Sequence, residues 1–133
     1  MKILITGVHG FVGSNLVKCL ASANEIYGLD IIAPEKEGVV KTYSWDDLDK
    51  GTIPEIDAII HLAGKAHDTK NQSAADVYFK VNTGLTQKIF DWYLAHPTAK
   101  KFIQFSTVKS AADRVEGEFL TEECIPTPVG PYG

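Results

Sequence analysis

Three glycines near the start of the chain have the spacing of a turn that binds phosphate. Gly7, Gly10 and Gly13 follow the apolar, largely β-branched run of residues 3–6 and lead into a helical pattern. Glycine at the first position permits a tight turn out of a strand, and at the third it lets the helix pack closely on the sheet. At the second, it lets backbone N–H groups approach a pyrophosphate at the positive end of the helix. The spacing therefore predicts a dinucleotide-binding turn.

An acidic residue at the end of the next apolar run strengthens this interpretation. Asp30 closes residues 26–30, at about the separation expected of a carboxylate that binds an adenosine ribose. The alternatives are an ordinary glycine-rich loop and a solvated acid at a strand end, and the strand–turn–helix context favours the binding interpretation over both. A carboxylate at this position would repel a 2′-phosphate, so the sequence favours NAD over NADP.

Alternating strand and helix patterns position these residues. We expect strands at 3–6, 25–30, 39–43, 57–62 and 101–106, a helix after the glycines, a helical turn at 45–50 and a long helix at 73–95. Residues 107–133 contain several prolines and are expected to form an extended loop. Strands joined by helical crossovers form a parallel sheet with helices on both faces. The predicted fold class is α/β, a Rossmann-like doubly wound parallel sheet truncated after about five strands, in one domain over residues 1–133.

The amino-acid composition limits the classes of binding partner and the cellular location that we expect. The 133 residues carry a formal net charge of −4 without a basic cluster, which argues against nucleic acid and anionic membranes as partners. No apolar run has membrane-spanning length and strand residues begin at position 2, so a cytoplasmic location is expected. Cys19 and Cys124 lack the paired spacing of a metal or redox site and are expected to be reduced thiols, with no metal bound.

Five segments give the chain a resemblance to a known family. They are TGVHGFVG (residues 6–13), HLAGKA (61–66), VNTGLT (81–86), FST (105–107) and GPYG (130–133). They are similar, in the same order, to the TGxxGFxG, DxxxHxAA, VNxxGT, catalytic Ser/Thr and PYGxSK motifs of the extended short-chain dehydrogenase/reductase family. Within that family the chain resembles the NAD-dependent nucleotide-sugar epimerase/dehydratase branch.

The resemblance implies a cofactor site for NAD and a nucleotide-sugar substrate. Beside Gly13, the residues that it places at the pyrophosphate are Gly7, Gly10, Phe11 and Val12. Asp30 would hold the adenosine ribose hydroxyls, and Asp46 or Asp47 would lie by the adenine. Leu62, Ala63 and Gly64 would border the cofactor beyond the fourth strand, and Asn82 would reach it from the long helix.

The resemblance also implies catalytic residues. Thr107, or less favourably Ser106, would hold the substrate hydroxyl, and Tyr132 would be the acid/base. The sequence departs from the family at residues 110–112, where SAA replaces a common VYG, and it ends before the lysine of the YxxxK motif. A free phenol, with a pKa of about 10, is a poor base near neutral pH without such a lysine. Residues 1–133 alone are therefore expected to be inactive.

Two functions from different classes remain open at this point. The chain is either the N-terminal part of an epimerase, dehydratase or 4-keto reductase, or a non-catalytic module that binds or senses a dinucleotide.

His61 is interpreted as a structural histidine at a strand end, and Trp92 and Tyr93 as core rather than interface. Lys65, His67 and Asp68 are interpreted as a solvated loop. The expected strand at 101–106 is apolar and would leave an open sheet edge, so a homo-oligomer is expected, formed through this edge, through the long helix at 73–95, or through both.

Overall fold

The computed structural model describes residues 1–66, 75–115 and 117–133, which form two compact units. The first unit contains residues 1–64 and 85–105, and the second contains residues 65–84 and 106–133. His67 and Asp68 lie outside the described residues, as do positions 73 and 74 of the long predicted helix.

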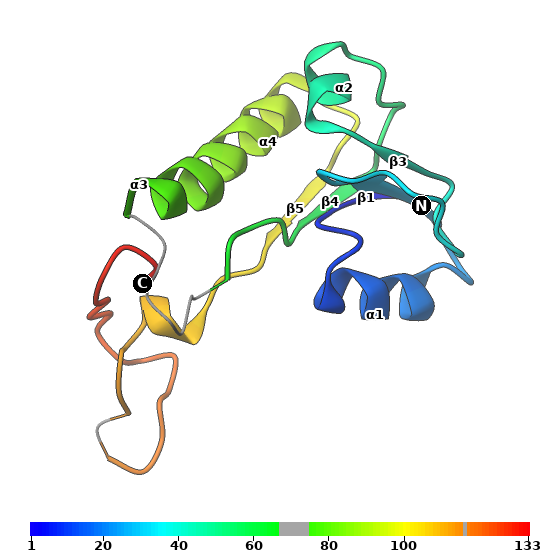
Figure 1. The fold of residues 1–133 in the computed structure, drawn as a ribbon. Helices are drawn as coiled ribbons and strands as arrows, with labels where there is room; N and C mark the ends of the chain where they lie inside the picture. The colour runs from blue at the N-terminus through cyan, green and yellow to red at the C-terminus, as the bar shows by residue number, and fades with distance from the viewer. Residues whose placement is uncertain (67–74, 116) are drawn as a thin grey trace. The chain divides into compact units, whose positions relative to one another are not determined.

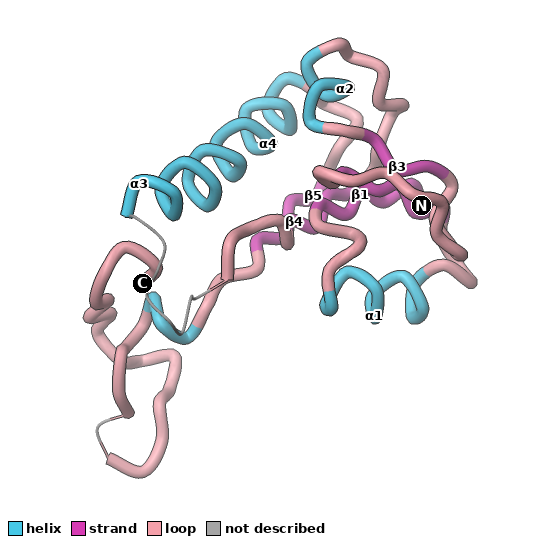
Figure 2. The backbone as a smooth tube through the Cα atoms, in the orientation of Figure 1, coloured by secondary structure: helices cyan, strands magenta, loops and turns pink. Residues whose placement is uncertain are grey.

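A five-stranded sheet forms the centre of the first unit (Figures 1 and 2). Each pair of neighbouring strands is parallel, and the order across the sheet is β3-β2-β1-β4-β5. The predicted α/β parallel sheet is therefore confirmed. The strands are β1 (Lys2–Thr6), β2 (Glu25–Leu29), β3 (Lys41–Tyr43), β4 (Ala58–His61) and β5 (Lys101–Gln104).

Helices cover both faces of this sheet, as the doubly wound arrangement requires. Helix α1 (Phe11–Leu20) lies on the opposite side of the sheet from α2 (Trp45–Asp49) and α4 (Gly84–Ala95) (Figure 1). On the α1 side, Val17 packs with Ile3, Ile5, Val8, Ile26 and Ile60. On the other side, Leu48 of α2 and Ile89 and Trp92 of α4 pack with Leu4, Tyr27, Leu29 and Ile59. Trp92 is buried and Tyr93 packs against the same core, so the core interpretation of both is confirmed.

The long predicted helix contains a change of helical type. It consists of α3 (Ala75–Tyr78), a π-helical segment at Phe79–Thr83 and then α4. A π-helix closes its hydrogen bonds one residue further along than an α-helix, and such segments occur frequently at functional sites. The α-helical spacing of the apolar residues predicted one continuous α-helix, and the π-helical segment corrects that.

The remaining differences are at element ends. The third strand was predicted at 39–43, but its ladder begins only at Lys41, although the Val40 N–H still donates to the Ile26 carbonyl (2.8 Å). Residues 107–133 are mostly loop, as predicted, but contain a short 3₁₀ helix at Val108–Ser110 and an isolated bridge between Ala112 and Thr127.

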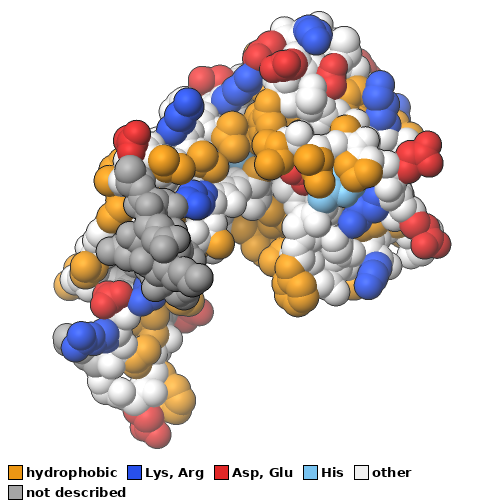
Figure 3. Space-filling view, viewed as in Figure 1, with side chains coloured by type: hydrophobic (Ala, Val, Ile, Leu, Met, Phe, Trp, Pro, Cys, Tyr) orange, Lys and Arg blue, Asp and Glu red, His pale blue; other side chains and the backbone are white. Residues whose placement is uncertain are grey.

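Charged side chains of both signs are interspersed on the face shown in Figure 3. Within the described segments, no helix has the length and apolarity needed to cross a membrane. The same segments contain no group of three or more His, Cys, Asp or Glu residues that could hold a metal ion. Both cysteines are free, with Cys19 exposed and Cys124 half-buried.

Candidate functional site

The glycine turn joins the carboxyl end of β1 to α1. Gly7 has a φ of +68°, a left-handed conformation that side chains disfavour. A Cβ atom here would also lie 3.0 Å from the Ala63 backbone nitrogen, so the segment after β4 passes directly against the turn. The turn is tied to the sheet because the Gly7 N–H donates to the Leu29 carbonyl (2.8 Å).

Gly13 allows a close approach, but its partner differs from the one predicted. A Cβ atom at Gly13 would lie 2.5 Å from the Gly7 carbonyl oxygen and 2.8 Å from the Val8 Cα. These are backbone atoms of the glycine turn itself. The absent side chain therefore lets the start of α1 approach the turn closely, while Val17, further along the helix, packs on the strands of the sheet.

The N-terminus of α1 is open to a ligand. Gly10 is the N-cap residue and no side chain caps the helix there. Its first turn contains no acidic residue, and Phe11 and Val12 are exposed. The first N–H groups of a helix have no partner within the helix and lie at the positive end of its dipole. This end of α1 is therefore suited to an anion such as a pyrophosphate.

Asp30 is held beside the glycine turn. Its Oδ2 accepts from the His9 N–H (3.0 Å) and its Oδ1 from the Ile31 N–H (2.8 Å). Each carboxylate oxygen can accept two hydrogen bonds, so each keeps capacity for a hydroxyl donor. The carboxylate is thus oriented, at the carboxyl end of β2, in a way that suits a pair of ribose hydroxyls.

Two residues of this region were missed by the sequence reasoning. His9 fixes Asp30 through its N–H, while its Nε2 lies 3.2 Å from the Thr42 Oγ1 on β3. Gly28 leaves room for the turn, because a Cβ there would lie 2.6 Å from Val8 Cγ1 and 2.8 Å from Thr42 Oγ1. A glycine inside a strand often marks such a close approach, so Gly28 carried a readable signal. His9 carried none.

The structure separates the two acidic candidates for the adenine side. Asp47 is engaged in capping α2, where its Oδ2 accepts from the N–H (2.9 Å) and the hydroxyl (2.8 Å) of Ser44. Those hydrogen bonds lower the pKa of the Asp47 carboxyl below its usual value, and the one from the Ser44 backbone has the larger effect. Asp46 is exposed in the same helical turn. Of the pair, Asp46 is the one whose carboxylate is not used by the cap.

Leu62 and Ala63 are fixed by a buried threonine. Both donate their N–H groups to the Oγ1 of Thr6, at 3.0 and 2.9 Å. Thr6 and His61 are fully buried, and Thr6 Oγ1 lies 2.6 Å from His61 Nδ1. Burial lowers the pKa of His61 to about 4. The structural interpretation of His61 is confirmed, since both of its ring nitrogens have partners inside the fold.

The other predicted site residues lie in the second unit. Asn82, in the π-helical segment, binds the backbone of Lys65 on both sides. Its Oδ1 accepts from the Lys65 N–H (2.6 Å), and its Nδ2 donates to the Lys65 carbonyl (3.1 Å). The amide predicted to reach the cofactor therefore holds the segment that follows Gly64. The Lys65 ammonium lies over the Tyr78 ring, 5.7 Å from its centroid.

The catalytic candidates are on the loop that follows β5. Thr107 caps the 3₁₀ helix, its Oγ1 accepting from the Lys109 N–H at 3.3 Å. Ser106 Oγ lies 3.3 Å from Ser110 Oγ. The Tyr132 ring meets that of Tyr78 edge-on, with centroids 5.8 Å apart. The structure thus places Ser106, Thr107 and Tyr132 in one unit and the glycine turn, Asp30 and residues 62–64 in the other.

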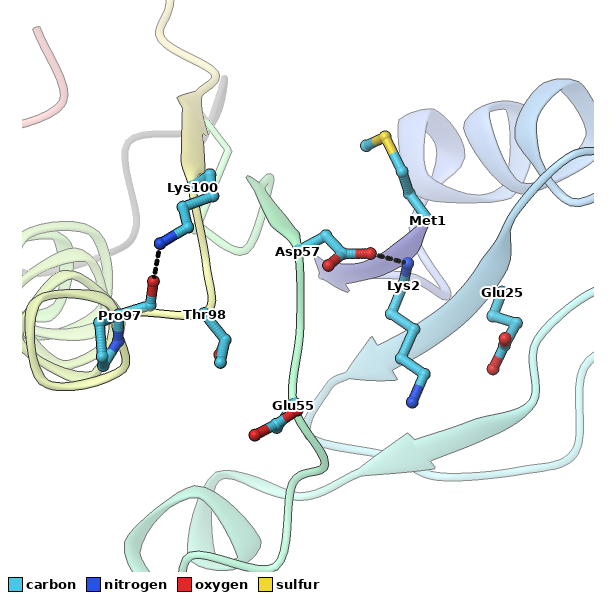
Figure 4. Close-up of a pocket in the computed structure, with 8 residues that line it drawn as sticks. All are labelled: Met1, Lys2, Glu25, Glu55, Asp57, Pro97, Thr98 and Lys100. Atoms are coloured by element: carbon cyan, nitrogen blue, oxygen red, sulfur yellow. Dashed lines mark hydrogen bonds between the residues drawn. The ribbon is translucent and has the colours of Figure 1, made fainter.

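A cavity of about 720 Å³ lies at the opposite end of the sheet, where the strands begin (Figure 4). Two of its side chains are paired with the backbone: Asp57 Oδ2 accepts from the Lys2 N–H (2.7 Å), and the Lys100 ammonium donates to the Pro97 carbonyl. None of the predicted cofactor residues lines it. Its lining residues are Met1, Lys2, Glu25, Glu55, Asp57, Pro97, Thr98 and Lys100.

Known proteins resemble this chain along almost its entire length. The sequence model of the NAD dependent epimerase/dehydratase family matches residues 3–133. D-erythronate dehydrogenase of Haemophilus influenzae is 27% identical over 146 residues, covering 100% of this chain and 46% of that protein. The dTDP-glucose 4,6-dehydratase of Streptomyces griseus is 25% identical, covering 98% of this chain and 44% of that protein.

Solved structures agree with these sequence relatives. UDP-glucuronic acid 4-epimerase from Bacillus cereus, in complex with NAD, superposes with a TM-score of 0.75 at 28% identity, covering 100% of this chain and 48% of that one. The UDP-Glc/GlcNAc 4-epimerase of Campylobacter jejuni gives a TM-score of 0.80 at 25% identity, covering 99% and 44%. The chain spans about half the length of the proteins it matches.

Proposed function

The chain belongs to the NAD dependent epimerase/dehydratase family, and from that membership we propose that it forms the cofactor-binding part of an enzyme acting on nucleotide sugars. The observation that carries the proposal is the convergence of three features at the carboxyl ends of β1, β2 and β4. These are the open N-terminus of α1, the oriented carboxylate of Asp30, and the segment 62–64 held against Gly7. Ligands of open α/β sheets bind at this edge.

We assign the adenosine half of NAD to Asp30 and the pyrophosphate to the N-terminus of α1. The carboxylate would accept from the ribose 2′- and 3′-hydroxyls and would repel a 2′-phosphate. The helix end would receive the two phosphates through Gly10, Phe11 and Val12, which are exposed. Gly13 would contribute from behind them, because it is buried and packs α1 against the glycine turn. Asp46 is the acidic side chain that we place near the adenine.

The proposed reaction is oxidation or reduction at a sugar carbon. Bound NAD supplies the hydride acceptor. The sugar C–H bond gives up a hydride, the C–O bond becomes a carbonyl, and the hydroxyl proton goes to a base. We assign Tyr132 as that base and Thr107, with Ser106 as the less favoured residue, as the group that holds the hydroxyl. Epimerases, dehydratases and reductases share this step and differ in the fate of the carbonyl sugar.

A nucleotide sugar is the favoured substrate class because several relatives are named for one. They include a dTDP-glucose dehydratase and a UDP-glucuronic acid epimerase. A sugar acid is the second candidate, since a relative at 27% identity is named D-erythronate dehydrogenase.

The proposal is tested in two stages. Isothermal titration of residues 1–133 with NAD and NADP should show binding of both, with NAD bound more tightly. The whole protein that contains this chain is then assayed for NADH formation with UDP-, GDP- and dTDP-sugars and with D-erythronate, beside its Tyr132→Phe variant. Turnover that the variant loses supports the assignment. NAD binding without turnover on any of these substrates would favour the non-catalytic dinucleotide module, and the absence of NAD binding would contradict both functions.

A further inference from the structure

A buried hydrogen-bonded network joins β1, β4 and α4 behind the proposed cofactor site. Thr6 Oγ1 receives the N–H groups of Leu62 (3.0 Å) and Ala63 (2.9 Å) and lies 2.6 Å from His61 Nδ1. On the other side of the ring, His61 Nε2 lies 2.9 Å from the Oγ1 of Thr86. Thr6 and His61 are fully buried, so their polar atoms must find partners inside the protein.

The distances determine where the protons are. A threonine hydroxyl has one hydrogen and two lone pairs. The N–H groups of Leu62 and Ala63 occupy both lone pairs of Thr6, so its hydrogen must point to His61 Nδ1. That nitrogen must therefore be an unprotonated acceptor, and in a neutral imidazole the single proton is then on Nε2. From there it is donated to Thr86.

We propose that His61 is a positioning residue of the dinucleotide site, whose Nε2–H tautomer orients the Thr6 hydroxyl so that Thr6 holds residues 62 and 63 in place. This inference rests on the proposed NAD site, because those residues border the cofactor there. A Cβ on Gly7 would lie 3.0 Å from the Ala63 nitrogen and 3.3 Å from the Leu62 carbonyl carbon. A small shift of this segment would therefore displace it against the glycine turn.

The same network resists protonation of the ring. A cationic His61 would place a third N–H donor against Thr6 Oγ1 and leave the threonine hydrogen without its acceptor. Among the described residues, its ring faces the hydroxyls of Thr6 and Thr86 and the ring of Phe102, whose centroid is 6.2 Å away. None of these carries a charge, and burial lowers the pKa of His61 to about 4.

Two measurements test this role. The first is the ¹⁵N-detected NMR spectrum of the imidazole in the unmodified protein between pH 5.5 and 8. We expect a protonated Nε2 and an unprotonated Nδ1 throughout this range. A proton on Nδ1, or a cationic ring at neutral pH, would overturn the inference whether or not NAD binds.

The second measurement compares the affinity for NAD in two variants of Thr6. Thr6→Val removes the hydroxyl and should weaken NAD binding about tenfold. That factor corresponds to the free energy of about one hydrogen bond, which the variant no longer contributes to holding residues 62 and 63. Thr6→Ser restores the hydroxyl and should rescue most of that loss. A folded Thr6→Val protein that binds NAD as tightly as the unmodified one would overturn the inference. If Thr6→Val does not fold, the inference is tested by the NMR assignment of the His61 tautomer and by the affinity of Thr6→Ser for NAD. A failure of the unmodified protein to bind NAD contradicts the proposed function instead, and the NMR result shows separately whether the network exists.

Discussion

Two helical glycines allow a comparison in which the same substitution should have opposite effects on stability. Gly13 lies in α1 and Gly84 is the first residue of α4. Replacing a glycine by alanine within a helix ordinarily stabilises by about 1 kcal/mol, because the alanine backbone loses less conformational entropy on folding. The surroundings of each position decide whether that gain survives.

At Gly13 the new methyl group would meet backbone that cannot turn aside. The Cβ would lie 2.5 Å from the Gly7 oxygen, 2.8 Å from Val8 Cα and 2.9 Å from the Val8 carbonyl carbon. Relieving these overlaps requires α1 to move away from the turn, and overpacking of this kind costs about 1–3 kcal/mol. At Gly84 the nearest atom is the Phe79 oxygen at 3.9 Å, an ordinary contact. Gly84→Ala should therefore keep the helical gain.

Urea unfolding of the two variants and the unmodified protein checks this comparison. We expect the free energy of unfolding to fall by about 1–3 kcal/mol in Gly13→Ala and to rise by about 0.5–1 kcal/mol in Gly84→Ala. Gly13→Ala should also weaken NAD binding, because the N-terminus of α1 moves with the helix. A Gly13→Ala protein that is as stable as Gly84→Ala and binds NAD normally would refute the close packing of α1 on the turn.

Three further predictions concern the cofactor, the buried histidine and the sheet edge. Asp30→Asn should weaken NAD binding and reduce the preference for NAD over NADP, both measured by isothermal titration. Glu55→Gln makes the same charge change at the other end of the sheet and should alter neither. Unchanged selectivity in Asp30→Asn would contradict the role of Asp30. Because the pKa of His61 is lowered to about 4 from a usual value near 6.5, the unfolded chain binds more protons between these values. The free energy of unfolding should therefore fall by up to about 3 kcal/mol as the pH drops from 6.5 to 4. If the urea midpoint of His61→Asn depends on pH as strongly as that of the unmodified protein, His61 is not the cause. Ile103→Lys should reduce self-association measured by analytical ultracentrifugation. A monomeric unmodified protein would contradict association through the β5 edge.

The choice of Ile103 follows from the register of β5. Phe102 pairs with Ile59 and packs against Phe90 and Tyr93 on the α4 side, so changing it would damage the core. Ile103 pairs with Ile60 on the α1 side and is 46% exposed. The sequence predicted an apolar edge strand, but only the structure shows that Phe102 is packed against the core while Ile103 remains exposed.

The sequence predicted well what depends on local pattern. The glycine spacing, the apolar runs and the acidic end of β2 each occupy a short window, and the sheet and its helices follow from them. Contacts between distant segments were not accessible in the same way. His9 meets Thr42 only because β3 pairs beside β2, and Thr86 meets His61 only because α4 crosses over β4. No periodicity reports such partners.

Other misses arose from short-range features with weak signals. The cap formed by Ser44 and Asp47 is legible as a serine followed three residues later by an acid, and that pattern would have separated Asp47 from Asp46. The π-helical segment at Phe79–Thr83 has no such signature, because the apolar residues Val77, Val81, Leu85 and Ile89 recur every four residues across it, a spacing that an α-helix also gives.

The strand order also has a consequence for synthesis on the ribosome. The partners of β1 are β2 and β4, so three strands of the sheet can pair once residue 61 has left the ribosome. The partner of β4 on its far side is β5, which lies roughly 40 residues further along, or about 2–8 s of elongation at ordinary rates. During that interval the buried strand AIIH of β4 is the edge of the nascent sheet, and the helix that will cover it is still being made. Codon usage or chaperone binding that changes the delay between the emergence of β4 and that of β5 therefore acts while this apolar edge is unpaired.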